Sequence, residues 1–240
     1  MTLPPDFFVV GGRSDSSRAA VAAFTAVKLG QRAMLRSSAD TVFLLAGAIE
    51  HVGSVGTTNR RIDASGMLHE ALDARIVLAA QDDDEVDPTL PGKFTRSLVG
   101  VIARGFVESS VAATGSEAEP NPPIACDANV LFLSEDDFIG EHDAWSTARP
   151  AQNIALSMGP RGGIRLWWRG AWSAVAEDAG ARRGSDSPAI AVLAAAFLVR
   201  LTETRDAVTA SRFAAAATTL LPHTPSLSYK DIPDRDAIPQ

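Results

Sequence analysis

Residues 185–197 read SDSPAIAVLAAAF, a polar turn followed at once by an alanine-rich apolar run. The run predicts a long helix that ends near Glu203. A helix start carries unpaired backbone N–H groups and the positive end of the helix dipole, so it can hold an anion. Close approach of an anion to the backbone usually requires glycine. This turn has Pro188 and Ile190 instead, and no carboxylate opens the helix.

The composition is that of a globular protein with one sizeable α/β core. The chain has 240 residues, of which 46% are hydrophobic and 21% charged. Its net charge of −7 argues against nucleic acids and membranes as partners, because both need concentrated Lys and Arg. Cys126 is the only cysteine, which predicts a reducing, cytoplasmic location. The first residues lack the pattern of a signal peptide.

Strand and helix patterns alternate along the chain, which predicts a mainly parallel α/β sheet. After the first apolar run, Ser14 to Ser17 offer caps for a helix from about Arg18 to Leu29. Gly30 is expected to close that helix. The expected strands are residues 7–10, 33–35, 42–45, 75–80, 98–107 and 129–133.

The alanine-rich run also resembles part of a known family. Residues 191–201, followed by Ser-Arg-Phe-Ala-Ala-Ala-Ala at 211–217, resemble the C-terminal part of the PfkB carbohydrate kinases, also called the ribokinase family. The resemblance implies a ribokinase-like three-layer α/β/α sandwich with a mainly parallel central sheet and a reduced β lid. It covers roughly residues 7–222 and depends on the order of segments more than on one motif.

Members of that family carry an Asp-x-Thr-Gly-Ala-Gly-Asp segment before a similar helix. Its glycines form an anion hole, and its last Asp deprotonates the acceptor hydroxyl. In this chain Ser187 takes the place of the Thr, and residues 188–190 take that of the Gly-Ala-Gly. Ala191 stands where the catalytic Asp would be, and Asp186 is the displaced candidate for that base. The resemblance thus implies a retained frame without its catalytic groups.

The resemblance also implies a set of substrate-binding residues. Gly11 and Gly12 follow the first strand, where the family places paired glycines near the sugar. Asp15 is the best remaining acceptor for a sugar hydroxyl in the region that follows. Arg104 stands where relatives often have Gln, which suggests a changed ligand or none. The alternative for the two glycines is that they only allow a tight turn.

Two further segments resemble the family's nucleotide-binding and metal-binding segments. Ser157, Gly159 and Gly162 fit the family pattern Thr-x-Gly-x-x-Gly, whose hydroxyl and backbone sit by the nucleotide phosphates. Asp137 takes the place of a Glu that helps arrange magnesium in relatives, and it is the metal candidate. Each has a structural alternative, because a glycine-rich hairpin turn needs no ligand and acidic residues favour a helix start. The four histidines lack metal-ligand spacing.

The remaining segments define the domain organisation. Residues 1–222 are predicted to form a single domain, in which 48–70 resemble the family's lid, and relatives often form homodimers through that lid. The run Glu-Val-Asp-Pro at 85–88 is expected to begin a helix, as it does in relatives. Residues 223–240 are rich in Pro, Asp and Ser and are predicted to be extended or loosely ordered. Their expected docking points are Tyr229 and Ile232.

Three functional hypotheses follow. The missing base and anion cradle argue against ordinary sugar-kinase turnover, because each typically contributes about a hundredfold or more. The first hypothesis is a non-catalytic kinase-fold protein, or regulatory pseudokinase, that binds a sugar, nucleoside, related small molecule or regulatory protein. The second is an enzyme whose ancestral pocket performs different chemistry. The third is a residual sugar or nucleoside kinase, and ATP and Mg²⁺ are expected only in that case.

Overall fold

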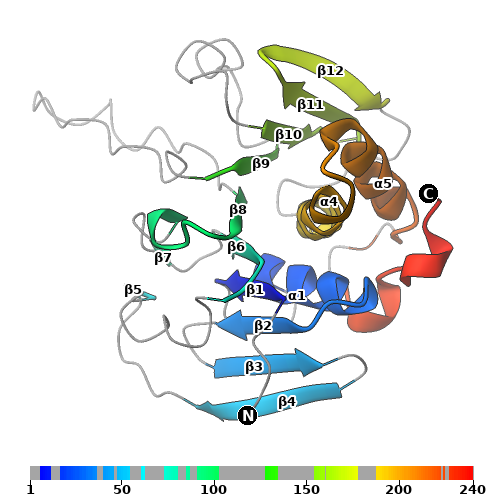
Figure 1. Ribbon diagram of the computed structural model, residues 1–240. Helices are drawn as coiled ribbons and strands as arrows, with labels where there is room; N and C mark the ends of the chain where they lie inside the picture. The colour runs from blue at the N-terminus through cyan, green and yellow to red at the C-terminus, as the bar shows by residue number, and fades with distance from the viewer. Residues whose placement is uncertain are drawn as a thin grey trace, which may run out of the picture.

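The computed structural model describes residues 6–11, 17–36, 40–45, 48–54, 61–62, 73–80, 85–86, 91–102, 128–134, 154–159, 161–177, 188–222, 224 and 227–239. In the strands between 40 and 62, and at 85–86, only the backbone is described. Most described strands join one large sheet in the order β12-β11-β10-β9-β8-β6-β1-β2-β3-β4 (Figure 1). Their bounds are β1 Phe7–Val10, β2 Ala33–Arg36, β3 Asp40–Leu45, β4 Ala48–Ser54, β6 Ile76–Ala80, β8 Leu98–Ile102, β9 Val130–Ser134, β10 Ile154–Met158, β11 Ile164–Trp168 and β12 Ala171–Ala176.

The centre of the large sheet is parallel, and its two ends are antiparallel. Strands β10, β9, β8, β6, β1 and β2 run parallel to one another. The hairpin of β11 and β12 continues the sheet antiparallel at one end, and β3 and β4 do so at the other. The buried strands are apolar on both sides, which is typical of a parallel sheet covered on both faces. The predicted mainly parallel α/β sheet is confirmed.

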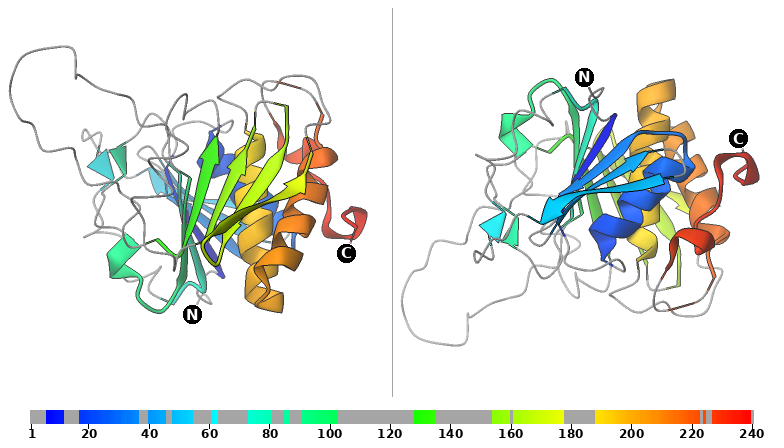
Figure 2. Two further views of the ribbon diagram at one scale, coloured as in Figure 1. Left: turned by 90° about the horizontal axis from the view of Figure 1, so that it is seen from above. Right: turned by 90° about the horizontal axis from the view of Figure 1, so that it is seen from below.

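The described α-helices α1, α4 and α5 pack on one face of this sheet (Figure 2). Helix α1 spans Arg18–Lys28, and the Ser17 hydroxyl caps it by accepting the N–H of Ala20 at 3.1 Å. Gly30 follows with a φ of +83°, a left-handed conformation that favours glycine. The predicted helix from about 18 to 29 is therefore confirmed to within one residue. Helices α4 and α5 span Ala189–Thr204 and Ala207–Thr219.

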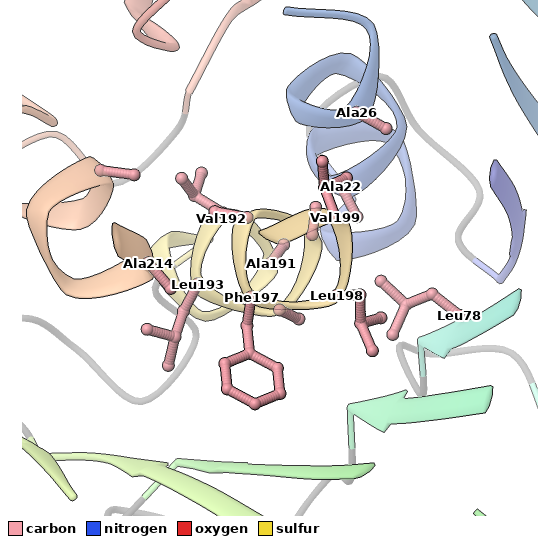
Figure 3. Packing of buried hydrophobic residues seen from close by; sticks show 14 of the residues in the cluster. Ala22, Ala26, Leu78, Ala191, Val192, Leu193, Phe197, Leu198, Val199 and Ala214 are labelled. Atoms are coloured by element: carbon pink, nitrogen blue, oxygen red, sulfur yellow. The ribbon is translucent and has the colours of Figure 1, made fainter. Parts of the chain in front are cut away.

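Helix α4 is the centre of the larger core. Every residue from Ala189 to Val199 is buried, so this helix is apolar on all sides rather than amphipathic. Figure 3 shows Leu198 pointing toward Leu78 of β6 and Val199 toward α1. Phe197 meets Phe132 of β9 edge to face, with ring centroids 5.9 Å apart. The predicted alanine-rich helix is confirmed, and it ends one residue beyond Glu203.

The opposite face of the sheet also carries a buried apolar cluster, to which Phe8, Val77, Val101 and Leu131 belong. A short 3-10 helix, η2 at Pro91–Lys93, precedes Phe94, whose ring lies 6.0 Å from that of Phe8. The prediction of a second helical layer on this face concerns residues outside the described ranges.

The lid region forms strands of two different sheets. Residues 48–54 form β4, the terminal strand of the large sheet. Arg61–Ile62 forms β5, which pairs in parallel with β7 at Glu85–Val86 in a separate two-stranded sheet. Glu85 and Val86 are therefore extended and do not begin a helix, which the β-branched Val86 favours, whereas Asp87 and Pro88 lie outside the described residues.

The C-terminal segment is folded against the helices, which differs from the predicted loosely ordered tail. It contains the 3-10 helices η4 at Tyr229–Asp231 and η5 at Arg235–Ala237. Tyr229 packs edge to face on Phe24 of α1, with ring centroids 5.7 Å apart. Apolar side chains spaced through the polar sequence explain the order, because each is 2–4% exposed in the larger core. These side chains are Leu227, Ile232 and Ile238.

Candidate functional site

Helix α4 begins at the edge of the sheet where the central parallel strands end. Helix α1 starts after β1 and runs back, so Leu29 lies at the opposite edge, where β2 begins. There Arg235 donates to the Leu29 carbonyl oxygen at 3.2 Å and to the Glu203 carboxylate at 2.7 Å. Helix α4 therefore ends at that opposite edge and begins at the carboxyl edge, as the left view of Figure 2 shows. In α/β sheets, ligands bind at the carboxyl edge.

The first turn of α4 lies where an anion could bind, but its described residues carry no polar side chain, and part of the usual set of backbone donors is missing or used. Pro188 is the N-cap in helical conformation, with φ −67° and ψ −6°, and it makes no side-chain capping hydrogen bond. Proline has no N–H to donate to an anion. The N–H of Ala191 donates to the Pro188 carbonyl oxygen at 3.0 Å. Ile190 and Ala191 are both 0% exposed, so apolar side chains fill the space around the turn.

The turn between β10 and β11 uses its glycine N–H groups internally. Gly159 donates to the Gly163 carbonyl oxygen at 2.8 Å, and Gly162 donates to the Gly159 carbonyl oxygen at 2.9 Å. Gly162 has a φ of +83°, so the turn itself requires glycine there. Hairpin geometry thus explains the glycine at 162, as the structural alternative predicted, and the N–H of Gly159 is used within the turn.

Ser157 lies beside that turn, near the end of β10, and is 1% exposed. Side chains alternate along a strand, and its neighbours Leu156 and Met158 belong to the core around α4. Ser157 therefore lies on the opposite face of the sheet from α4. The structure does not bring the Ser157 hydroxyl and the Ala191 position together on one face.

Gly11 occupies a position that only glycine can take. Its φ is +128°, and a Cβ at this position would collide with the carbonyl oxygen of Ala80, at the end of β6. Its N–H donates to the Arg36 carbonyl oxygen at 2.9 Å, which ties the ends of β1 and β2 together. The geometry supports the tight-turn alternative for this glycine, whether or not a ligand binds beside it.

The other predicted site residues lie outside the described residues. They are Gly12, Asp15, Arg104, Asp137, Asp186 and Ser187. Within the described ranges no three His, Cys, Asp or Glu side chains gather as metal ligands. No helix in the described part of the chain is long and apolar enough to cross a membrane.

Three polar residues lie at the carboxyl edge, and the sequence patterns did not single out two of them, Arg18 and Arg36, as binding groups. Arg18 opens α1 and is 6% exposed, and Arg36 ends β2 beside Val10. Ser134 ends β9 and is 6% exposed. The signal for Arg18 was available, since a cation in the first turn of a helix opposes the helix dipole.

Among the described residues, the groups with shifted pKa values lie at the opposite edge of the sheet. A hydrogen bond from Arg32 lowers the pKa of Asp6, and the two side chains form a two-pronged ion pair at 2.9 and 3.0 Å. Partial burial raises the pKa of Glu203, but hydrogen bonds from Arg235 and Arg200 outweigh it, so the net pKa is lowered. These groups hold elements together and lie away from the start of α4.

Comparison with known proteins identifies the fold but not the activity. No protein-family profile and no curated protein matches the sequence. A solved structure of Arabidopsis thaliana ribokinase with ribose and ATP matches with a TM-score of 0.62 at 16% identity, over 98% of this chain and 97% of that one. The chain has the ribokinase fold.

Two further structures with the ribokinase fold extend this likeness. A pyrophosphate-dependent kinase of the ribokinase family, with a pyrophosphate analogue and myo-inositol, gives a TM-score of 0.60 at 14% identity, over 94% of this chain and 98% of that one. A nucleoside kinase from Methanocaldococcus jannaschii gives 0.57 at 13% identity, over 96% of both chains. The predicted resemblance is thus confirmed at the level of the fold.

Proposed function

We propose that this protein uses a ribokinase fold to bind a sugar, nucleoside or related small molecule, without ordinary phosphoryl transfer. The binding site is the carboxyl edge of the sheet, between Gly11 and the start of α4. The same proposal includes a regulatory role, in which ligand binding changes the interaction with a partner protein. A cytoplasmic location is also part of it and rests on the lone Cys126.

The observation that carries the proposal is the first turn of α4. Phosphoryl transfer depends on a base at the acceptor hydroxyl and on donors that stabilise charge on the transferred group. Ala191 is 0% exposed and has no titratable group, while Pro188 has no N–H. Loss of the base alone removes about a hundredfold or more of the rate, and loss of one charge-stabilising donor removes a similar factor.

The turn between β10 and β11 supports the same conclusion independently. A phosphate-binding turn needs N–H groups directed at the ligand. Those of Gly159 and Gly162 are donated to carbonyl oxygens of the turn, at 2.8 and 2.9 Å. In both segments that hold phosphates in the resembled family, some backbone donors are therefore missing or used: Pro188 has no N–H, and those of Ala191, Gly159 and Gly162 donate within the chain.

Isothermal titration calorimetry separates the hypotheses. We expect heat of binding with at least one member of a panel of sugars and nucleosides. When ATP and Mg²⁺ are added, we expect mass spectrometry to detect no phosphorylated product. Rapid ATP-dependent phosphorylation would overturn the proposal. A product of another kind would favour an enzyme with changed chemistry in the ancestral pocket.

A matched pair of variants tests the displaced base. Asp186→Ala removes the remaining candidate, and Asp73→Ala removes an exposed carboxylate elsewhere as a control. If the protein is a binding module, both variants leave turnover at background. If turnover is measurable and falls only in Asp186→Ala, then the protein is a residual kinase with Asp186 as its base.

A further inference from the structure

One buried hydroxyl near the candidate site is not used by the fold. Thr25, Ser211 and Thr218 are also buried, and each donates from its hydroxyl to a backbone carbonyl oxygen at 2.8 Å. Ser134 is similarly buried, at 6% exposure, but its hydroxyl makes no hydrogen bond with a described residue. Its Oγ atom is not among the fully enclosed unbonded atoms of the described residues, so a ligand can reach it. A hydroxyl with so little exposure and no hydrogen bond lowers stability, which is expected where its partner is a bound molecule.

The Ser134 side chain lies on the face of the sheet that α4 covers. Side chains alternate along β9, where Phe132 belongs to the larger core, whereas Leu131 and Leu133 belong to the cluster on the opposite face. In β10, Met158 pairs with Ser134 and also belongs to the larger core. Ser134 therefore points to the α4 side from the carboxyl end of its strand.

Ser134 also lies next to the start of α4. Phe197 of α4 meets Phe132 of β9 with ring centroids 5.9 Å apart. Two residues along a strand advance about 6.6 Å, and four residues along a helix advance about 6 Å. Because α4 runs opposite to β9, Ser134 lies level with Leu193, which Figure 3 shows on the side of α4 that faces the sheet. The first turn of α4 follows directly beyond it, at the carboxyl edge.

The surroundings of Ser134 favour an uncharged partner. A phosphate at a helix start needs several N–H donors in addition to the helix dipole, but Pro188 has no N–H and that of Ala191 donates within the turn. Arg18 opens α1, which packs mainly on β1 and β2, three and four strands away from β9 in the sheet. A serine hydroxyl both donates and accepts, as the hydroxyl groups of a sugar do.

We propose that Ser134 binds an uncharged hydroxyl group of the ligand, such as a ring hydroxyl of a sugar, beside the first turn of α4. This inference rests on the proposed function and makes it more specific. The part of the ligand that lies between β9 and α4 carries hydroxyl groups and no phosphate. In the complex, the Ser134 hydroxyl gains the hydrogen bond that the described residues do not supply.

Thermal unfolding without ligand tests whether the hydroxyl is unused by the fold. Ser134→Ala removes a hydroxyl without a described partner, so its unfolding midpoint should equal or exceed that of wild type. Ser211→Ala is the matched control, because it removes the hydrogen bond to the Val208 carbonyl oxygen. It should lower the midpoint by about 2–4 °C. Equal lowering in both variants would overturn the inference, because Ser134 would then have an internal partner.

Calorimetry on the same variants tests the chemistry of the ligand. The probe is the sugar or nucleoside of the panel that binds wild type most tightly, and inorganic phosphate is the competitor. We expect Ser134→Ala to weaken binding about tenfold, the effect of one hydrogen bond, and both Ser211→Ala and phosphate to leave it unchanged. Full affinity in Ser134→Ala, or displacement of the probe by phosphate, would overturn this inference while the proposed function stands. If no sugar or nucleoside binds wild type, the proposed function and this inference both fail.

Discussion

The two ends of α4 differ in their chemistry. At its C-terminal end, the Glu203 carboxylate accepts hydrogen bonds from Arg235 at 2.7 Å and from Arg200 at 3.2 Å. Arg235 also donates to the Leu29 carbonyl oxygen. At its N-terminal end, Pro188 provides no side-chain cap and Ala191 is enclosed by apolar groups. In a phosphotransfer site the charged and polar groups would be expected at the N-terminal end. Here the described ion pairs stabilise the fold at the edge opposite the candidate site.

Deleting residues 223–240 should have the largest effect, because the tail completes the C-terminal end of α4. The deletion removes three side chains that are 2–4% exposed, together with the ion pair to Glu203. At about 1.5–3 kcal/mol for each buried side chain, the loss is roughly 5 kcal/mol or more. This approaches the whole stability of a typical domain. Urea unfolding measures it, and deletion of residues 239–240 alone is the control, since it should leave the midpoint unchanged.

Ala191→Asp tests the N-terminal end by restoring a carboxylate where the resemblance places the base. Ala191 is 0% exposed, so an ionised carboxylate there would be buried without a described partner and should cost roughly 4 kcal/mol. Burial would raise the pKa of the new carboxyl. Stability should therefore fall as pH rises above the unfolded value of about 4.

Ala191→Asn is the matched variant, because it has nearly the same shape and no charge. Its stability should change little between pH 4 and 8, whereas that of Ala191→Asp should fall progressively. Thermal unfolding across that range measures the difference. Equal pH profiles would mean that the position opens to solvent, as a catalytic base must, and the contrast between the two ends of α4 would then be lost.

Gly11→Ala separates the structural role of this glycine from a ligand role. An added Cβ would collide with the Ala80 carbonyl oxygen, and the φ of +128° disfavours any L side chain. Strain and overpacking together predict a loss of roughly 3 kcal/mol in the unfolding free energy. Gly30→Ala is the control, because its φ is +83° but nothing lies within 4 Å of the added Cβ. Gly30→Ala should therefore lose only about 1 kcal/mol. Equal losses would indicate that the backbone at Gly11 relaxes.

The architecture was accessible from sequence because it depends on local patterns and segment order. Apolar runs fixed the strands, Ser17 and Gly30 bounded α1, and the alanine run marked α4. The ordering of residues 227–239 was not accessible, since it depends on Leu227, Ile232 and Ile238 reaching a core built by distant segments. The strand at Glu85–Val86 was also missed, because its partner β5 is remote in sequence.

The candidate site was less accessible for a different reason. The sequence patterns identify which residues occupy family positions, but they cannot say whether an N–H is already used. Gly159 and Gly162 fit the phosphate pattern by identity, and only the hydrogen bonds to Gly163 and Gly159 show that their donors are occupied. Residue identity thus indicated which turn to inspect, whereas whether its N–H groups are already used could be read only from the coordinates.

Glu203→Gln should have the smallest effect and sharpens the contrast from the C-terminal end of α4. The hydrogen bonds from Arg235 and Arg200 lower the net pKa of Glu203 despite partial burial. For a carboxyl whose folded pKa is depressed, the stabilisation is present above the unfolded pKa of about 4.3 and is lost as pH falls through the folded pKa. The side chain is 29% exposed, so solvent screening limits the loss at pH 7 to about 1 kcal/mol.

Unfolding free energies measured at pH 7 and near pH 3 should show the difference between Glu203→Gln and wild type shrinking at the lower pH. A difference that is constant with pH would mean that the pair acts through packing alone, and the charge contrast between the two ends of α4 would not contribute to stability.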